Sequence, residues 1–315
     1  MNALYPIRVS GFYNLCLRVL GEVRFPMHFS NFSKKMYGNF VHVFLLVYKE
    51  KLNVSYRRFV EIADENNLQR MLCIKRIPHF TTLQKFLQKI NKPVFEKMVR
   101  ACRKLLNLKD IEASIDGTGF SNNNPSHYYA ERVDGVKVKN YTKSVYVTDN
   151  KTKLILNIKT HSDNANETLD FIPLVSELVK SLKIVLADKA YDSRKNREYC
   201  WKNSIEVHIP LRDWPQTREG YGHKPRFSKA RRIACKLFKP ETYKRRSLIE
   251  SVNSAIKRTL GSYVCSRRPD NQQKQTTIKA IAYNLEITNR KIKVWFFINC
   301  RGFLHRLSFG KINKL

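Results

Sequence analysis

Tyr243-Lys-Arg-Arg246-Ser-Leu-Ile-Glu250-Ser-Val-Asn-Ser-Ala-Ile-Lys257 is the stretch that most limits how the chain can fold. At about 100° per residue of an α-helix, its four functional side chains fall within about 60° of one another and form one polar stripe. The apolar side chains take the other side: Leu248, Ile249, Val252, Ala255, Ile256 and Leu260. The pattern predicts a helix with one buried face and one face that offers a carboxylate, two cations and a phenol. The alternative is an ordinary basic amphipathic helix with a solvated face.

The sequence before this helix has the pattern of a β-sheet. The expected strands are residues 111–116, 141–148, 153–160, 184–188 and 206–211. Residues 184–188 are apolar up to a final Asp, as is typical of a central strand buried on both faces. Helices are expected at residues 168–182, 193–203 and 271–297. This order predicts an α/β fold with a mixed sheet, flanking helices and a right-handed crossover before the fourth strand.

Two aspartates lie where expected strands end. Asp116 ends the first strand and Asp188 ends the fourth. These strands can be neighbours in a mixed sheet, so we expect both carboxylates at one edge, with the helix that carries Glu250 packed beside them. Taken singly, an Asp at a strand end is usually a turn or cap residue. Asp192 is an alternative ligand to Asp188, although the buried strand in front of Asp188 favours the latter.

The three carboxylates suit a hard metal ion. Asp116, Asp188 and Glu250 offer oxygen ligands of the kind that Mg²⁺ or Mn²⁺ prefers. Two such ions about 3.5–4 Å apart can activate an attacking oxygen and stabilise a leaving oxygen in phosphoryl transfer. The neighbouring cations would contact phosphate, as a bidentate guanidinium in Arg246 and as a point charge in Lys257. Tyr243 would orient a phosphate or stack on a base.

The composition favours a polyanionic partner. The formal net charge is +33, from 59 Lys and Arg against 26 Asp and Glu. A field of this size favours nucleic acid, because basic side chains release counterions from the phosphates that they neutralise. A basic structural protein without chemistry is the alternative, but 43% hydrophobic residues are enough for a large core. Seven scattered cysteines and the lack of a long apolar run predict reduced thiols in a cytoplasmic protein without a membrane span.

The first third of the chain has a different pattern. Residues 34–108 show helical periodicity, with a break at residues 77–80 before a basic helix. That arrangement resembles a helix-turn-helix with Lys85 among its exposed side chains, and a plain helical bundle is the alternative. We therefore expect a helical N-terminal DNA-binding domain at residues 1–108. An α/β domain would follow at residues 109–300 and a basic tail at residues 301–315.

The motifs together resemble those of the DDE transposases of prokaryotic insertion sequences, in the branch with the signature Y-x-x-R-x-x-x-E-x-x-x-x-x-x-K. Its four positions are all present: Tyr243, Arg246, Glu250 and Lys257. Asp116, in Ile-Asp-Gly-Thr-Gly-Phe, and Asp188, in Ala-Asp-Lys-Ala-Tyr-Asp, resemble the first and second acidic motifs of the family. The similarity covers about residues 75–290. The sequence His127-Tyr-Tyr after the first motif is similar to archaeal members.

The resemblance implies an RNase H-like catalytic domain that binds two Mg²⁺ or Mn²⁺ ions through Asp116, Asp188 and Glu250. The other signature residues would handle the DNA strand. Such enzymes cleave DNA at transposon ends to free a 3′-hydroxyl, which then attacks target DNA. The implied partners are terminal inverted repeats, target DNA and a second copy of the chain in a synaptic complex, at the nucleoid.

Two other interpretations fit the same residues. One is a catalytically inactive DNA-binding relic or repressor of an insertion sequence, and the other is a hydrolytic nuclease without strand transfer. The segment between Asp188 and Glu250 is also too short for a large inserted β-domain, which puts hairpin protection of donor ends in doubt.

Overall fold

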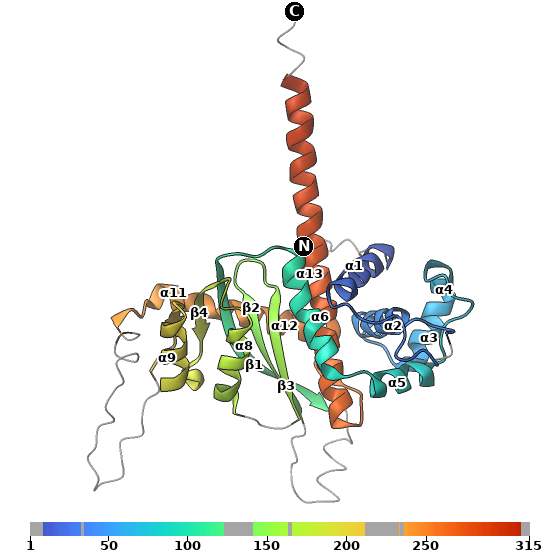
Figure 1. Ribbon diagram of the computed structural model, residues 1–315, viewed down its shortest axis with the longest axis horizontal. Coiled ribbons are helices and arrows are strands. Elements are labelled where there is room, and N and C mark those ends of the chain that lie inside the picture. The colour runs from blue at the N-terminus through green and yellow to red at the C-terminus, as the bar shows by residue number, and fades with distance from the viewer. Residues whose placement is uncertain are drawn as a thin grey trace, which may run out of the picture.

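The computed structural model in Figure 1 describes residues 9–32, 35–122, 141–162, 166–211, 233 and 236–309. The strands are β1 (Ile111–Asn122), β2 (Tyr141–Asp149), β3 (Ile155–His161), β4 (Leu182–Ala187), β5 (Glu206–His208) and β6 (Tyr263–Val264). The helices are α1 (Val9–Glu22), α2 (Asn39–Leu52), α3 (Tyr56–Glu65), α4 (Leu68–Met71), α5 (Phe80–Lys89), α6 (Lys92–Leu105), α8 (Phe171–Ser176), α9 (Arg194–Lys202), α11 (Pro240–Lys244), α12 (Leu248–Leu260) and α13 (Pro269–Phe309). Three 3₁₀ turns are η1 (Glu167–Asp170), η2 (Lys189–Tyr191) and η3 (Arg245–Ser247) in the described residues.

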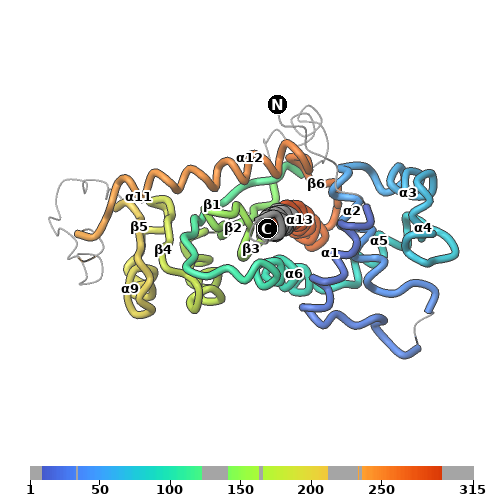
Figure 2. Tube along the Cα trace, turned by 90° about the horizontal axis from the view of Figure 1, so that it is seen from above, coloured from blue at the N-terminus to red at the C-terminus, as the bar shows by residue number. Residues whose placement is uncertain are grey.

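The described strands form one mixed sheet in the order β3-β2-β1-β4-β5, with β6 paired to the far end of β1. β1 runs antiparallel to β2 and parallel to β4. The mixed α/β fold with flanking helices is therefore confirmed. Figure 2 shows α12 on one side of this sheet and α6 and α9 on the other.

The first strand is longer than predicted. The expectation that it ends at Asp116 is wrong, because Gly117 to Ser121 continue the antiparallel ladder with β2 as far as Tyr141. In this second half the side chains of Thr118 and Phe120 are buried. The parallel pairing with β4 does stop beside Asp116, at Ile115. Asp116 thus lies where β1 leaves its parallel neighbour.

Two helix predictions also need correction. The helix expected at residues 168–182 is only η1 followed by α8, which ends at Ser176, and Leu182 already begins β4. The helix expected at residues 271–297 is α13, which begins at Pro269 and continues to Phe309, across the boundary drawn at residue 300. Figure 1 shows the far part of α13 projecting beyond the sheet.

The N-terminal third is helical, as predicted. α2 is buried on most of its surface, with Phe44 and Leu45 fully covered. The helix-turn-helix interpretation finds no support in the connection before α5: residues 72–79 separate α4 from α5, whereas the motif joins its helices by a turn of about 3–4 residues. Lys85 nevertheless lies exposed on α5, as the predicted pattern required.

α13 joins this helical region to the sheet through buried polar side chains. Lys274 donates to the carbonyl oxygens of Leu87 and Gln88 at the end of α5, at 3.1 and 3.2 Å. Lys279 donates to the carbonyl oxygen of Leu260 at the end of α12. Lysines at these places satisfy carbonyls that a helix leaves unpaired at its C-terminus. One helix therefore holds the ends of two others.

A buried ion cluster lies beside Lys279. Its Nζ atom is 3.3 Å from Glu50 of α2, which also pairs with Lys49 at 2.6 Å. Gln275 donates to the same carboxylate at 3.0 Å. Burial alone would raise the pKa of Glu50, but the two lysines hold it below its ordinary value. Breaking such a buried pair from one side typically costs about 3–5 kcal/mol, so the contact between α2 and α13 is specific.

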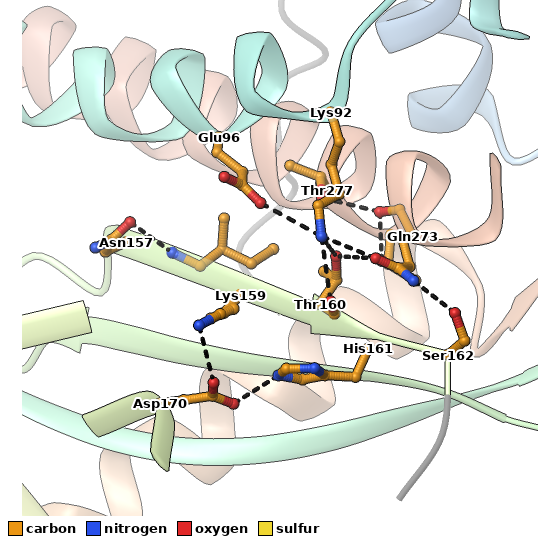
Figure 3. A network of polar contacts seen from close by, with 12 residues as sticks. Lys92, Glu96, Asn157, Lys159, Thr160, His161, Ser162, Asp170, Gln273 and Thr277 are labelled. Atoms are coloured by element: carbon orange, nitrogen blue, oxygen red, sulfur yellow. Dashed lines mark hydrogen bonds and ion pairs between the residues drawn. The ribbon is translucent and has the colours of Figure 1, made fainter. Parts of the chain in front are cut away.

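A second polar group ties α6 to the edge of the sheet (Figure 3). Lys92 at the start of α6 donates to Gln273 of α13 at 2.8 Å and to the carbonyl oxygen of Thr160 in β3 at 3.3 Å. In the same view, Asp170 of η1 lies against His161 and Lys159 of β3. The helical region, the sheet and α13 thus share side-chain contacts along β3.

No helix in the described part of the chain is long and apolar enough to cross a membrane. Cys16, Cys73, Cys102, Cys200 and Cys265 are free cysteines in the structure.

Candidate active site

The sheet brings the two predicted aspartates to the same edge. Ile115 and Ala187 are partners across the parallel pair of β1 and β4, and each is followed directly by an aspartate. Asp116 continues in β1, whereas Asp188 begins the 3₁₀ turn η2 and accepts a hydrogen bond from the backbone N–H of Lys189 at 2.5 Å. Both side chains are partly buried. The juxtaposition follows from the register of the parallel pair.

Asp192 has a different environment from Asp188. Its Oδ1 accepts from Nε of Arg197 at 2.8 Å, and the two side chains are 0% and 1% exposed. The same guanidinium donates to the carbonyl oxygen of Ile209 at 2.7 Å. Asp192 therefore holds α9 to the segment after β5, and its oxygen faces a buried arginine. This geometry favours Asp188 as the carboxylate available to a ligand.

The predicted helix at residues 243–257 is interrupted. Tyr243 belongs to α11, Arg246 to the 3₁₀ turn η3, and Glu250 and Lys257 to α12. The single polar stripe expected over this stretch therefore spans three elements. Its apolar side is mostly as predicted, with Ile249, Val252, Ile256 and Leu260 buried and Leu248 and Ala255 only partly covered.

Arg245 shows why the chain turns at this point. Its guanidinium makes two contacts with the carboxylate of Glu112, at 2.8 and 2.7 Å, and so attaches η3 to the start of β1. A bidentate contact of this kind fixes both distance and orientation. The next residue, Arg246, is consequently directed toward Asp116.

Arg246 lies beside two of the predicted carboxylates. Its Nη2 is 2.7 Å from Oε1 of Glu250, and its Nη1 is 4.0 Å from Oδ1 of Asp116. Burial lowers the pKa of Arg246, but Asp116, Glu250, Asp188 and the Tyr243 phenol together raise it above its ordinary value. Two of the three predicted carboxylates, Glu250 and Asp116, thus lie beside one guanidinium, and Asp188 is close enough to act on its charge.

Asp116 is the most perturbed acid of this group. Burial raises the pKa of Asp116 from 3.8 to about 6. The charge of Arg246 opposes this increase, and the nearby charge of Glu167 adds to it. Its Oδ2 accepts a hydrogen bond from Nδ2 of Asn253 at 3.1 Å. A carboxylate desolvated among like charges is stabilised by any cation that reaches it. Asp116 therefore has an environment suited to a cationic ligand.

The remaining signature residues surround this centre. The ring of Tyr243 packs against Phe238 at a centroid distance of 5.5 Å. Burial raises the pKa of Tyr243, with further raising contributions from Asp188 and Glu250 and an opposing one from Arg246. Lys257 lies seven residues beyond Glu250 on α12, with Nζ 5.9 Å from the centre of the Phe120 ring of β1. Lys257, the last residue of the signature, therefore lies beside the second half of β1.

Lys85 is not part of this centre. Figures 1 and 2 place α5 on the opposite side of α13 from α11. Most of the basic segment at residues 218–239, which by its charge would suit nonspecific contact with DNA, lies outside the described residues, as does His127. The site is therefore built from β1, β4, η3 and α12.

Sequence reasoning missed two residues beside Asp116. Asn253 follows Glu250 by three residues and so lies on its helix face, a spacing that could have identified it. Glu167 comes from η1, and its contacts depend on the register of three strands. No local sequence signal could have placed it next to Asp116.

The donor set suits a hard divalent cation, but the side chains are arranged around Arg246. Within the described residues, no three Asp, Glu, His or Cys side chains converge closely enough to hold a metal ion as they stand. The guanidinium lies between Glu250 and Asp116 and neutralises the carboxylates that such an ion would otherwise neutralise. The carboxylate oxygens of Asp116, Asp188 and Glu250 are ligands of the type that such an ion prefers, and in this structure two of the three acids are paired with Arg246.

Comparison with known proteins gives a family match over this part of the chain. Residues 108–285, more than half of the sequence, match the family described as "Transposase DDE domain". A solved structure, of a piggyBac transposase synaptic complex with hairpin DNA, is similar over 90% of this chain and 74% of that chain, with 11% sequence identity and a TM-score of 0.47. No curated protein is significantly similar to the chain.

Proposed function

The chain belongs to the DDE transposase domain family, and from this we propose that it cleaves DNA at transposon ends and joins the freed 3′-hydroxyl to target DNA. We also propose that the chain belongs to the branch of this family that carries the Y-R-E-K signature. One observation supports the proposed activity above the others: Arg246 lies beside Glu250 and Asp116, and Asp188 follows the residue that pairs with the one before Asp116 in the parallel strands. Arg246 is a suitable ligand for a DNA phosphate in the same place.

Asp116, Asp188 and Glu250 are the proposed ligands of two Mg²⁺ or Mn²⁺ ions. When bound, the ions would activate the attacking oxygen and stabilise the leaving oxygen of the displaced phosphodiester. Asp188 is partly buried and bound only to its own turn through Lys189 N–H among the contacts described. Glu250 is 57% exposed and can rotate without leaving a buried group unpaired.

The signature cations would hold the DNA strand. In the structure the Arg246 guanidinium neutralises Glu250 and Asp116. On metal binding the proposed change is a rotation of Arg246 from these carboxylates to a phosphate, which it can bind bidentately. Lys257, which is seven residues and so about 10 Å beyond Glu250 along α12, would contact the next phosphates of the same strand. Tyr243 would orient the scissile phosphate or stack on a base.

The helical N-terminal region is the proposed site of end recognition. Lys85 is exposed on α5, and the chain as a whole carries a net charge of +33. Binding of terminal inverted repeats there, and of target DNA near the carboxylates, would place two DNA segments on one protein. Joining both transposon ends calls for a homodimer, and such a protein would work at the nucleoid.

Cleavage of a labelled duplex that carries the element's own end, in Mg²⁺ or Mn²⁺, tests this function. Wild type should nick at the end boundary, and Glu250→Gln should bind the duplex but leave it intact. Glu241→Gln is the matched control, because Glu241 is 81% exposed and pairs only with Lys244 among the described contacts. Nicking by Glu250→Gln at the wild-type rate would overturn the proposal.

Two other outcomes distinguish the alternatives. Binding without nicking by wild type at any metal concentration would favour an inactive DNA-binding relic or repressor. Nicking without joining to a target duplex would identify a hydrolytic nuclease.

A further inference from the structure

Glu167 connects the elements that carry Asp116 and Asp188. Its Oε1 lies 2.6 Å from Nζ of Lys143 in β2, and its Oε2 accepts from the hydroxyl of Tyr191 in η2 at 2.8 Å. Lys143 pairs across the ladder with Gly119 of β1, and η2 begins directly after Asp188. One carboxylate thus holds a strand beside Asp116 and the turn that follows Asp188.

Gly117 allows this close approach. A Cβ atom at position 117 would overlap the carboxylate of Glu167, so the carboxylate rests directly on the backbone of the residue after Asp116. The φ angle of Gly117 is not among the positive values of the described residues. Glycine is therefore required here for space and not for backbone conformation.

Neighbouring residues strengthen the same link. Thr168 donates from Oγ1 to the carbonyl oxygen of Ala190 at 2.6 Å. Asn196 of α9 donates to the carbonyl oxygens of Tyr191 and Thr168, at 3.0 and 3.4 Å. The turns η1 and η2 are consequently bound to each other through both side chains and backbone.

The other end of η1 is attached to β3. Oδ2 of Asp170 is 2.6 Å from Nε2 of His161, and Oδ1 is 3.3 Å from Nζ of Lys159 (Figure 3). η1 is therefore fixed to the sheet at Asp170 and reaches over β1 with Glu167. This makes η1 a rigid support for the acidic centre.

We propose that Glu167 is a positioning residue that sets the separation of Asp116 and Asp188. Both of its oxygens are occupied by Lys143 and Tyr191, so it acts on the metal site through backbone and turn geometry and not as a ligand. Its charge lies close enough to Asp116 to repel it, a cost that a contact serving stability alone would avoid. The inference rests on the proposed function, because it concerns the geometry of that same site.

The test is single-turnover cleavage of the end duplex by the full chain carrying Glu167→Gln, Tyr191→Phe or both. Tyr191→Phe removes only the hydroxyl that donates to Glu167. Displacing a catalytic group by about 1 Å can cost on the order of 100-fold in rate, and we expect each variant to lose between about 10- and 100-fold. The double variant should lose no more than either single variant, because both changes break one contact.

Three further measurements separate positioning from a general effect on folding. The DNA dissociation constant and the melting temperature should stay at wild-type values, while the Mn²⁺ concentration for half-maximal cleavage rises. Glu177→Gln, at an exposed glutamate on the C-cap of α8, is the control and should cleave like wild type. Gly117→Ala, which displaces Glu167 without altering it, should reproduce the cleavage defect.

Several outcomes would overturn the inference. Wild-type cleavage by Glu167→Gln, multiplicative losses in the double variant, or losses that follow the melting temperature would each exclude a positioning role. If wild type itself fails to cleave, the proposed function falls and this inference falls with it. If wild type cleaves and the variants do too, only the inference falls.

Discussion

Arg197 donates from Nε to Oδ1 of Asp192 at 2.8 Å, and both side chains are buried. This contact distinguishes the environment of Asp192 from that of Asp188, which lies four residues earlier in the same motif. Asp192 serves the fold, whereas Asp188 is directed to the edge where β4 ends.

Asp188→Asn and Asp192→Asn should therefore fail in different ways. Asp192→Asn leaves Arg197 as an uncompensated buried charge and should lower the free energy of unfolding by about 3–5 kcal/mol. Asp188→Asn should keep the wild-type melting temperature and lose metal-dependent cleavage. Thermal unfolding and the end-cleavage assay on both variants measure this, and a stable but inactive Asp192→Asn would reverse the assignment.

Asp116 should make stability fall as pH rises. Its pKa is raised from 3.8 to about 6, so between these values the folded state keeps a proton that the unfolded state has lost. The contribution of Asp116 to the free energy of unfolding is then greatest below about pH 4 and falls by up to about 3 kcal/mol as pH rises through 6. Without metal, Asp116→Asn should lack this component and be more stable than wild type at pH 7.5.

Melting temperatures of both proteins in a chelator, from pH 4 to pH 8, check the Asp116 prediction. Asp110→Asn is the control, because that aspartate is 71% exposed. Parallel curves for wild type and Asp116→Asn would show that Asp116 titrates normally.

Arg246 should compete with metal ions for the carboxylates. Arg246→Gln removes the cation between Glu250 and Asp116, and we expect Mn²⁺ to bind about fivefold more tightly in the absence of DNA, from about 1 kcal/mol of lost repulsion. The same variant should bind the end duplex more weakly. Calorimetric titration with Mn²⁺ and fluorescence anisotropy with DNA give the two affinities.

Lys244→Gln is the matched control for Arg246→Gln, since it removes an equal charge two residues away from a side chain that is 71% exposed and pairs with Glu241. It should not strengthen Mn²⁺ binding. Equal Mn²⁺ affinities for wild type and Arg246→Gln would mean that the guanidinium does not occupy the metal position.

Lys85→Ala should weaken binding to the transposon end. An exposed lysine that contacts one phosphate contributes about one unit to the slope of log affinity against log salt. Lys180→Ala removes an equal charge from an exposed position after α8 and should have little effect. Anisotropy titrations over a range of salt concentrations compare the two, and equal slopes would remove Lys85 from the binding surface.

The sequence predicted those features that depend on local pattern. The apolar run of β4 identified a buried central strand and placed Asp188 at its end, as found. The end of β1 could not be predicted from Asp116-Gly-Thr-Gly, because the strand continues by pairing with β2 and, at its far end, with β6. The interruption of the helix at η3 could not be predicted either, because it depends on a contact between Arg245 and Glu112, which lies 133 residues earlier. The role proposed for Glu167 likewise requires contacts between elements that are distant in sequence.

Lys274 and Lys279 are five residues apart on α13, about 7.5 Å along the helix axis. They hold the last carbonyls of α5, which carries Lys85, and of α12, which carries Glu250. In an enzyme that recognises DNA with α5 and cleaves it at Glu250, α13 would therefore fix the distance between the recognition helix and the cleavage site. The number of base pairs between the sequence recognised and the bond broken becomes a property of the protein, and an end with one base pair inserted there will present the wrong phosphodiester to the carboxylates.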